Sequence, residues 1–464
     1  MSITIVGLGP GNPQQLTREA WQVLEHSREV YLRTRHHPTV PALPDHLTLH
    51  SFDYLYEEKD DFAAVYETIA EKVIALSQRP QGVVYAVPGH PLVGEASVQR
   101  ILRAAQERGI PVRIVPGLSF IEPVLTCLGL DALDGLQILD ATDLAARYHP
   151  LLNPDLPALI GQLYGRHLAS QVKLTLMHLY PDDYPVTLVG RAGLADEWTR
   201  TLPLYELDRV PEVDHLTTLY IPPLPQPSSL PAFLDTIAHL RAPNGCPWDR
   251  QQTHQSLREA MLEECYEVLA ALDADDPQAL REELGDLLLQ IALHTQIAVE
   301  GGEFSIADVI SSIDAKIKRR HPHVFAGLKV NSVDEVLHNW EAIKQREKEA
   351  RGEGKRESHN ILAGVPRALP ALARVQSLQE RAARHGYPWP EAEQAKELVE
   401  SALARLMVLP AGEEREQVCG EVLFHMVSLA RSLGIDAESA LREAAERFIR
   451  RFQGDFIHHA NPRA

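Results

Sequence analysis

The sequence predicts a multidomain protein in which an α/β part is followed by a helical part. Three observations lead to this prediction. The first 220 residues contain short apolar, β-prone runs that each end in a glycine-containing loop. Beyond residue 250, two long stretches place apolar residues at steps of three and four, the period of an amphipathic helix. The length of 464 residues is enough for about three domains of ordinary size.

The N-terminus shows a strand, a loop and a helix in that order. Ile3–Val6 is a short apolar run, and residues 20–24 have helical spacing. The loop between them contains the residues Gly7, Gly9, Pro10 and Gly11. It is not a dinucleotide-binding fingerprint, because that motif needs a glycine where this chain has Asn12, and because Pro10 is foreign to it.

Two further strand-to-loop patterns follow the first. The run 82–87 leads into the loop Pro88-Gly89-His90-Pro91, and the run 112–115 leads into the loop Pro116-Gly117-Leu118-Ser119-Phe120. Glycine-rich loops at strand ends are where α/β sheets bind ligands. Any one of these loops taken alone could equally be a tight turn.

With these loops, residues 2–222 resemble the tetrapyrrole (corrin and porphyrin) methylases, which are class III S-adenosylmethionine-dependent methyltransferases. The resemblance implies two α/β halves with S-adenosylmethionine held in the cleft between them. The residues that it implies for cofactor binding are Gly7, Gly9, Pro10, Gly11, Pro88, Gly89, His90, Pro116 and Ser119. Corrin methylases usually read Gly-Asp-Pro in the middle loop and often Gly-Thr in the second half. This chain has His90 and Leu194 at those places, which disfavours a tetrapyrrole as the methyl acceptor.

The helical stretches carry two acidic strings, Glu-Glu-x-x-Glu and Glu-x-x-Asp. Residues three apart on a helix share a face, and the segment 272–277 reads as a turn that folds the second helix antiparallel to the first. Four carboxylates are therefore predicted to converge, with Glu263 at the edge of the cluster. These four belong to Glu264, Glu267, Glu283 and Asp286.

Such a cluster predicts a metal site. Oxygen ligands without Cys or His favour Mg²⁺, with Mn²⁺ as the alternative. The competing interpretation is a solvated acidic face, which is common on helices. The small residues Ala260, Ala271 and Gly285 near the acids leave room for a ligand and favour the metal site.

A basic segment follows at residues 316–325, in a chain whose net charge is −19. This combination suits a polyphosphate ligand. The carboxylates would hold a metal, the metal would hold phosphate oxygens, and the cations would neutralise the remaining charge. Trp340 and Lys344 could add a stacking ring and another cation, although a Trp at helical spacing is more often part of a core.

Residues 232–350 resemble the MazG-type nucleoside triphosphate pyrophosphohydrolases. The matching strings are Cys-Pro-Trp-Asp at 246–249, the two acidic strings, Arg-Arg-His-Pro-His-Val-Phe at 319–325 and Asn-Trp-Glu-Ala-Ile-Lys at 339–344. The resemblance implies an all-α, dimer-forming domain that uses Mg²⁺ to cleave a nucleoside triphosphate to a monophosphate and pyrophosphate. It makes the four carboxylates metal ligands and Glu263 an assisting residue. The residues implied to contact substrate phosphates are Lys316, Arg319 and Arg320.

The C-terminal residues 361–464 resemble a second, degenerate MazG unit. Lys396 stands where the first unit has Glu263, and Val418 stands where it has Glu283. A site that loses a carboxylate and gains a cation should bind a divalent ion poorly. We therefore expect a structural or dimerisation role for this unit. The predicted domains are 1–222, 232–350 and 361–464, joined by a Pro-rich linker at 223–231 and a charged linker at 351–360.

The composition indicates where the protein acts and which partners it lacks. The four cysteines show no metal spacing or disulfide framework, and neither a signal peptide nor a membrane-spanning run is evident. The acidic net charge argues against sequence-independent nucleic-acid binding. We therefore expect a cytoplasmic protein with no nucleic-acid or membrane partner and, by resemblance, a homodimer formed through the MazG units.

The function predicted from these residues is Mg²⁺-dependent hydrolysis of nucleoside triphosphates, with broad or house-cleaning specificity. Glu263 or Glu264 would be the catalytic carboxylate that orients water. Two alternatives stay open. The N-terminal domain could be the principal enzyme, a methyltransferase regulated by the helical half, or the helical half could be a nucleotide sensor that does not turn its ligand over.

Overall fold

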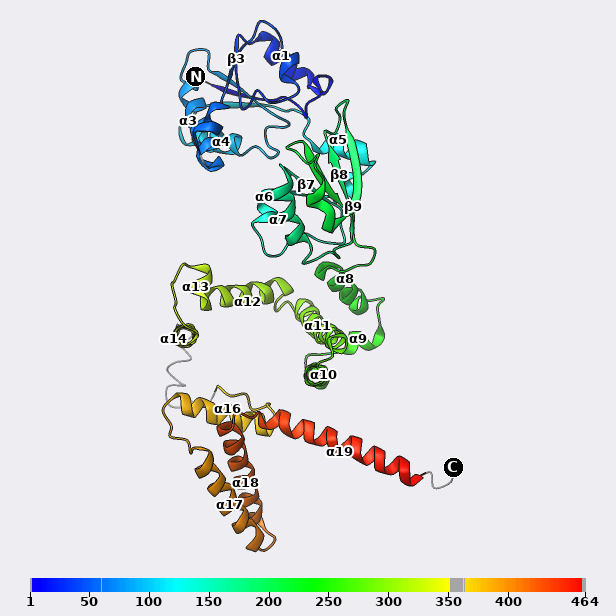
Figure 1. The fold of residues 1–464 in the computed structure, drawn as a ribbon, viewed down its shortest axis with the longest axis vertical. Coiled ribbons are helices and arrows are strands. Elements are labelled where there is room, and N and C mark those ends of the chain that lie inside the picture. Colours follow the sequence, from blue (N-terminus) through cyan, green and yellow to red (C-terminus); the bar gives the residue numbers. More distant parts are fainter. Residues whose placement is uncertain (1, 60, 351–361, 363, 461–464) are drawn as a thin grey trace. The chain divides into compact units, whose positions relative to one another are not determined.

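The computed structural model describes residues 2–59, 61–350, 362 and 364–460 (Figure 1). The predicted linker at 351–360 lies outside these residues. The internal contacts divide the chain into a first unit, residues 1–305, and a second unit, residues 306–464. The division falls inside the predicted domain 232–350, and the domain boundaries expected from the sequence stay predictions. Each unit is described by itself.

The first unit opens with a five-stranded parallel sheet in the order β3-β2-β4-β1-β5. Side chains alternate between its faces: Ile3 and Ile5 pack with α3 and α4, whereas Val6 packs with α1. Both faces are thus covered, as all-parallel sheets require. The elements are β1 (Ile3–Gly7), α1 (Arg18–His26), β2 (Glu29–Leu32), β3 (Thr48–Ser51), α2 (Tyr54–Glu58), α3 (Phe62–Ser77), β4 (Val83–Val87), α4 (Ala96–Glu107) and β5 (Val112–Val115).

A second five-stranded sheet follows, in the order β6-β7-β10-β8-β9. β6 and β7 are parallel and the other pairs are antiparallel. Its core packs against α6 and α7 on one face, and Val124 of α5 packs on the other. The elements are α5 (Ile121–Leu128), β6 (Gln137–Asp140), α6 (Ala141–Ala145), β7 (Ala158–Gly161), α7 (Arg166–Leu176), β8 (Pro185–Gly190), β9 (Trp198–Pro203) and β10 (Thr217–Ile221). The predicted α/β fold with two halves is confirmed.

The first unit ends in helices. The Pro-rich segment is held by Asp155, whose carboxylate accepts from the backbone N–H groups of Ser228 at 2.6 Å and Ser229 at 3.1 Å. Asp276 caps the longest helix of this unit by accepting from two of its first N–H groups. The helices are α8 (Leu230–Arg241), α9 (Pro247–Gln251), α10 (Arg258–Asp273) and α11 (Pro277–Gly301). The predicted turn is shorter than 272–277, because α10 continues through Asp273.

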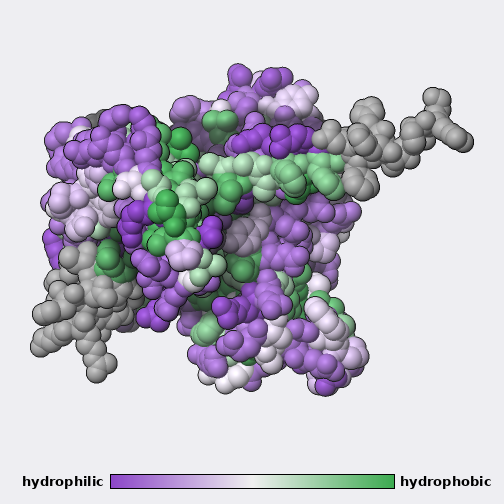
Figure 2. All heavy atoms as spheres, turned by 90° about the horizontal axis from the view of Figure 1, so that it is seen from below, coloured by the Kyte–Doolittle hydropathy of each residue, from purple (hydrophilic) through white to green (hydrophobic). Residues whose placement is uncertain are grey.

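The regular secondary structure in the described residues of the second unit is all helical, so the predicted all-α character of this part is confirmed. Its helices are α12 (Ile306–Arg320), α13 (Pro322–Phe325), α14 (Val333–Ala350), α16 (Ala371–Arg384), α17 (Ala392–Val408), α18 (Glu413–Ser432) and α19 (Ala437–Ala460). Large apolar side chains remain exposed on several of them, and Figure 2 shows green side chains among the polar ones.

Within the described part of the chain, no single helix is long and apolar enough to cross a membrane. The helix Glu413–Ser432 and the segment Ala437–Phe452 that follows it would together be long and apolar enough, but they are bent by 104° at the break between them.

Candidate functional site

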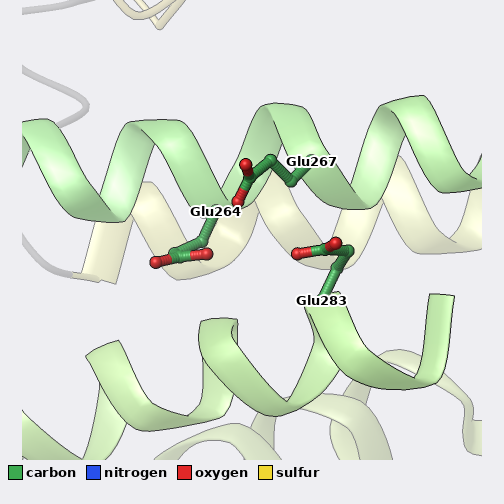
Figure 3. A group of neighbouring side chains, drawn as sticks. All are labelled: Glu264, Glu267 and Glu283. Atoms are coloured by element: carbon green, nitrogen blue, oxygen red, sulfur yellow. The ribbon is translucent and has the colours of Figure 1, made fainter. Parts of the chain in front are cut away.

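Three carboxylates meet where α10 packs against α11. Glu264 and Glu267 extend from α10 and Glu283 extends toward them from α11 (Figure 3). One oxygen of each carboxylate lies within 4.8 Å of the other two. Mg²⁺ takes oxygen ligands at about 2.1 Å, so that two ligands on one ion lie at most about 4.2 Å apart. Small side-chain movements would therefore bring the three groups onto one cation.

The electrostatics of this cluster favour a cation. Partial burial raises the pKa of Glu264, and the neighbouring Asp286 and Glu267 carboxylates raise it further. Burial, and then Glu267 and Asp286, also raise the pKa of Glu283. Proximity of like charges makes the ionised forms unfavourable, and a divalent ion would remove that penalty.

The other two predicted carboxylates lie beside this group. Asp286 acts on the pKa of both Glu264 and Glu283, although its oxygens are not among the three that lie within 4.8 Å. Glu263 is exposed next to Glu264. No heavy atom lies within 4 Å of where a Cβ on Gly285 would be, so the space expected there is present.

Metal should therefore stabilise the protein in a pH-dependent way. The folded-state pKa values of Glu264 and Glu283 lie above their ordinary values, so that the metal-free protein loses stability as pH rises through those raised values. We expect Mg²⁺ to raise the unfolding temperature more at pH 7.5 than at pH 5, as measured by calorimetry. Glu283→Gln should lose most of this gain. The matched variant Glu259→Gln, which changes another acid of α10, should keep it, and equal gains in both variants would contradict a site at this cluster.

The predicted substrate contacts lie on α12 and α14 of the second unit. Nη2 of Arg319 and Nη2 of Arg320 each lie 2.6 Å from a carboxylate oxygen of Glu347. The Arg320 guanidinium lies 5.0 Å from the centroid of the Trp340 ring, and Nζ of Lys344 lies 4.9 Å from it. Four of the five predicted residues thus form one cluster, with the fifth, Lys316, one helical turn before Arg320.

Glu347 is the member of this cluster that the sequence analysis missed. The available signal was its spacing on α14, three residues after Lys344 and seven after Trp340, which places the three side chains on one helical face.

The N-terminal glycine loops come together because their strands are neighbours in the sheet. They follow β4, β1 and β5, which lie side by side. The Gly9 N–H donates to the Gly89 carbonyl at 3.3 Å, and the Gly89 N–H donates to the Gly9 carbonyl at 2.8 Å. A Cβ on Gly7 would lie 2.6 Å from the Gly89 carbonyl oxygen and 2.7 Å from the Gly117 nitrogen. The third loop is tied to Thr17, which donates through Oγ1 to the Pro116 carbonyl at 2.9 Å.

Other loop residues are engaged locally or reach the second half. Ser119 donates through its backbone N–H and its hydroxyl to Glu122, at 2.7 and 2.6 Å. Nδ1 of His90 accepts from the Leu92 N–H at 3.1 Å. The Asn12 side chain donates across the halves to the Gly193 carbonyl at 3.1 Å.

Comparison with known proteins places these features in families. The family described as "MazG nucleotide pyrophosphohydrolase domain" matches residues 252–325, and the family described as "Tetrapyrrole (Corrin/Porphyrin) Methylases" matches residues 2–208. A nucleoside triphosphate pyrophosphohydrolase/pyrophosphatase MazG of Thermotoga maritima is 42% identical over 46% of this chain and 80% of its own length. A nucleoside triphosphate pyrophosphohydrolase of Escherichia coli K12 is 41% identical over 48% and 84%. The chain belongs to the MazG family.

Its N-terminal domain makes it a fusion of a tetrapyrrole methylase domain with MazG. The uncharacterized protein YabN of Bacillus subtilis strain 168 is 40% identical over 97% of this chain and 92% of its own length, so that YabN is similar over nearly the whole chain. The fusion predicted from the sequence is confirmed.

The segment that the sequence predicts to be a second, degenerate MazG unit, residues 361–464, pairs its acids with cations of its own helices. Helices α17 and α18 pack together as α10 and α11 do. Lys396 Nζ lies 3.0 Å from a Glu393 oxygen, and Arg405 Nη1 lies 3.0 Å from a Glu421 oxygen. Within the described ranges, the trio on α10 and α11 is the one group of carboxylates close enough to share a metal ion.

The methylase domain has buried polar atoms beside its loops that suit a polar ligand. Oε1 of Gln15 and Nδ1 of His37 are buried without a hydrogen-bond partner among the described residues. Burial, and then the Arg33 guanidinium, lower the pKa of His37 to about 4, so that the ring is neutral at pH 7. Gln15 lies beside Gly193, and His37 lies beside the backbone of Gly9. These unused atoms fit S-adenosylmethionine, which offers both donors and acceptors.

Proposed function

We propose that the MazG part of this chain hydrolyses nucleoside triphosphates to nucleoside monophosphates and pyrophosphate with Mg²⁺, Mn²⁺ being the alternative metal. The observation that carries the proposal is the carboxylate trio on α10 and α11, which lies inside the segment matched by the MazG family. Two relatives named as pyrophosphohydrolases are 42% and 41% identical to this part of the chain, over 80% and 84% of their own lengths.

The acidic residues would have two roles, which are to bind the metal ion and to accept a proton from water. Glu264, Glu267 and Glu283 would hold Mg²⁺ with help from Asp286. Bound Mg²⁺ supplies positive charge to phosphate oxygens and lowers the pKa of water. Glu263 would accept a proton from the attacking water as the phosphoanhydride bond breaks.

The departing pyrophosphate carries negative charge that the protein must offset. Lys316, Arg319 and Arg320 would supply the compensating cations, with Lys344 beside them. Phosphoryl transfer depends chiefly on positioning and electrostatics, so that no covalent nucleophile is required. We propose broad specificity among bases, with Trp340 as the stacking surface.

The proposal is tested by incubating the full chain with ordinary and modified nucleoside triphosphates, in Mg²⁺ and in EDTA. Metal-dependent pyrophosphate release supports it and ranks the substrates. Saturable nucleotide binding without turnover would instead support the alternative in which the helical half is a nucleotide sensor.

We further propose that the tetrapyrrole methylase domain binds S-adenosylmethionine. The supporting observations are the three glycine loops at one sheet edge and the unused polar atoms of Gln15 and His37. Stoichiometric binding in a titration, followed by methyl transfer to a small acceptor, would make this domain a second enzyme. If the heat of S-adenosylmethionine titration were no larger than the heat of dilution, the proposal that this domain binds S-adenosylmethionine would be wrong.

We also propose a homodimer formed through the MazG units. Val309, Ile310, Ile313 and Ile317 follow one face of α12, and each is 37–47% exposed. An apolar stripe of this kind is normally covered. Ile313→Asp should convert the dimer to a monomer, as measured by light scattering during size-exclusion chromatography. A monomeric parent chain, or a dimeric Ile313→Asp variant, would contradict this interface. The cytoplasmic location and the lack of nucleic-acid and membrane partners stay predictions.

A further inference from the structure

One carboxylate occupies two arginines that the proposed function assigns to phosphate. Nε of Arg319 donates to Oε1 of Glu347 at 2.6 Å, and Nη2 of Arg319 lies 2.6 Å from the same oxygen. Nη2 and Nε of Arg320 donate to Oε2 at 2.6 and 3.2 Å. The Glu347 side chain is 11% exposed, whereas that of Arg319 is 50% exposed. The carboxylate therefore lies inside the pair, and one of its arginines faces solvent.

The arginine pair suits an anion that carries more charge than one carboxylate. Guanidinium forks match carboxylate and phosphate oxygens with similar geometry. Two guanidinium groups on one carboxylate leave a net positive charge. Lys344 lies nearby, at the Trp340 ring that Arg320 also faces. Hydrogen bonds from Arg320, and then from Arg319, hold the pKa of Glu347 below its usual range against the effect of burial, so that it is ionised at neutral pH.

We propose that Glu347 occupies the phosphate position of the free protein, so that a polyphosphate binds Arg319 and Arg320 only by displacing it. The ligand class is an anion of adjoining phosphates, namely a nucleoside triphosphate or pyrophosphate. The inference rests on the proposed function, which assigns these arginines to substrate. Glu347 would then compete with the ligand within the same chain. The apparent affinity would equal the intrinsic affinity multiplied by the fraction of molecules in which the arginines are open.

The first test measures steady-state pyrophosphate release by the full chain. Glu347→Gln removes the competing charge and keeps nearly the same shape. We expect the KM for the nucleoside triphosphate to fall roughly tenfold, about the strength of charge-assisted hydrogen bonds at a partly exposed site. The value of kcat should stay the same, because the substrate-bound protein has already displaced Glu347.

The chain offers a matched control on α12, the helix that carries the two arginines. Asp314 and Lys318 of α12 form an exposed ion pair with each other at 2.8 Å. Asp314→Asn removes one negative charge, as Glu347→Gln does, and should leave KM unchanged. An equal fall of KM in both variants would show an effect of net charge alone and would overturn the proposal.

A second measurement separates this inference from the proposed function. Pyrophosphate without metal is titrated into the parent chain and both variants by calorimetry, after circular dichroism has shown equal helix content. Tighter binding in Glu347→Gln alone supports displacement, even if no triphosphate is hydrolysed and the proposed function fails. Unchanged or weaker binding in a folded Glu347→Gln variant would mean that Glu347 positions the arginines, and the inference would be wrong. Glu347→Asp, with a shorter carboxylate, should give intermediate affinity.

Discussion

Glu264→Gln should abolish pyrophosphate release while leaving the protein folded. Glu264 has an oxygen within 4.8 Å of oxygens of both Glu267 and Glu283, and burial, then the carboxylates of Asp286, Glu267 and Glu263, raise its pKa. Its amide replacement keeps the side-chain shape but removes one charged ligand of the proposed cation. We expect kcat to fall on the order of 10³-fold, which corresponds to about 4 kcal/mol of activation free energy. The measurement is metal-dependent turnover at saturating substrate.

The predicted second MazG unit, residues 361–464, supplies the control for this variant. Glu400→Gln changes an acid on α17, where Lys396 lies among the acids. We expect this variant to keep full turnover. If Glu400→Gln lost turnover and Glu264→Gln kept it, catalysis would instead lie in the predicted second MazG unit, residues 361–464. Both variants should unfold near the temperature of the parent chain in EDTA, since Glu264→Gln relieves repulsion and does not remove packing.

The second large effect is expected from Gly7→Ala in the methylase domain. A Cβ at this position would meet two backbone atoms, at 2.6 and 2.7 Å, and backbone atoms at the ends of buried strands move little. We expect a loss of about 3 kcal/mol in unfolding free energy, at the upper end of ordinary overpacking. Binding of S-adenosylmethionine should weaken with it, because the three loops meet at this residue.

Gly165→Ala is the matched control, because no heavy atom lies within 4 Å of where its Cβ would be. The unfolding of the methylase domain is followed by calorimetry and cofactor binding by titration. If Gly7→Ala were as stable as Gly165→Ala, the tight meeting of the three loops would be contradicted. Pyrophosphate release should persist in the Gly165→Ala variant.

The local elements could be predicted from the sequence because their signals are local. The strands β1, β4 and β5 follow from short apolar runs, and α10 and α11 follow from apolar spacing. The order of the strands could not be read in this way. β1 lies between β4 and β5, which is what brings the three loops to one place, and that order depends on long-range pairing.

The candidate site shows the same division. Glu264 and Glu267 share a helical face by their spacing alone, so that half of the cluster could be predicted directly. Which acids of α11 come nearest depends on how the two helices cross and on side-chain rotamers. As a result Glu283 joins the close group and Asp286 lies beside it. The place of Glu347 on the helical face of Trp340 and Lys344 could be predicted, but its pairing with Arg320 could not, because the two residues meet across 27 residues through the packing of α12 on α14.

We propose above that this chain cleaves nucleoside triphosphates between the α- and β-phosphates, which yields nucleoside monophosphate and pyrophosphate. The most direct measurement is ³¹P NMR of the products formed by the full chain from a nucleoside triphosphate, with Mg²⁺ and then with EDTA. We expect nucleoside monophosphate and pyrophosphate in equal amounts with Mg²⁺, and neither product with EDTA. Nucleoside diphosphate and orthophosphate, or no product from any nucleoside triphosphate, would contradict it.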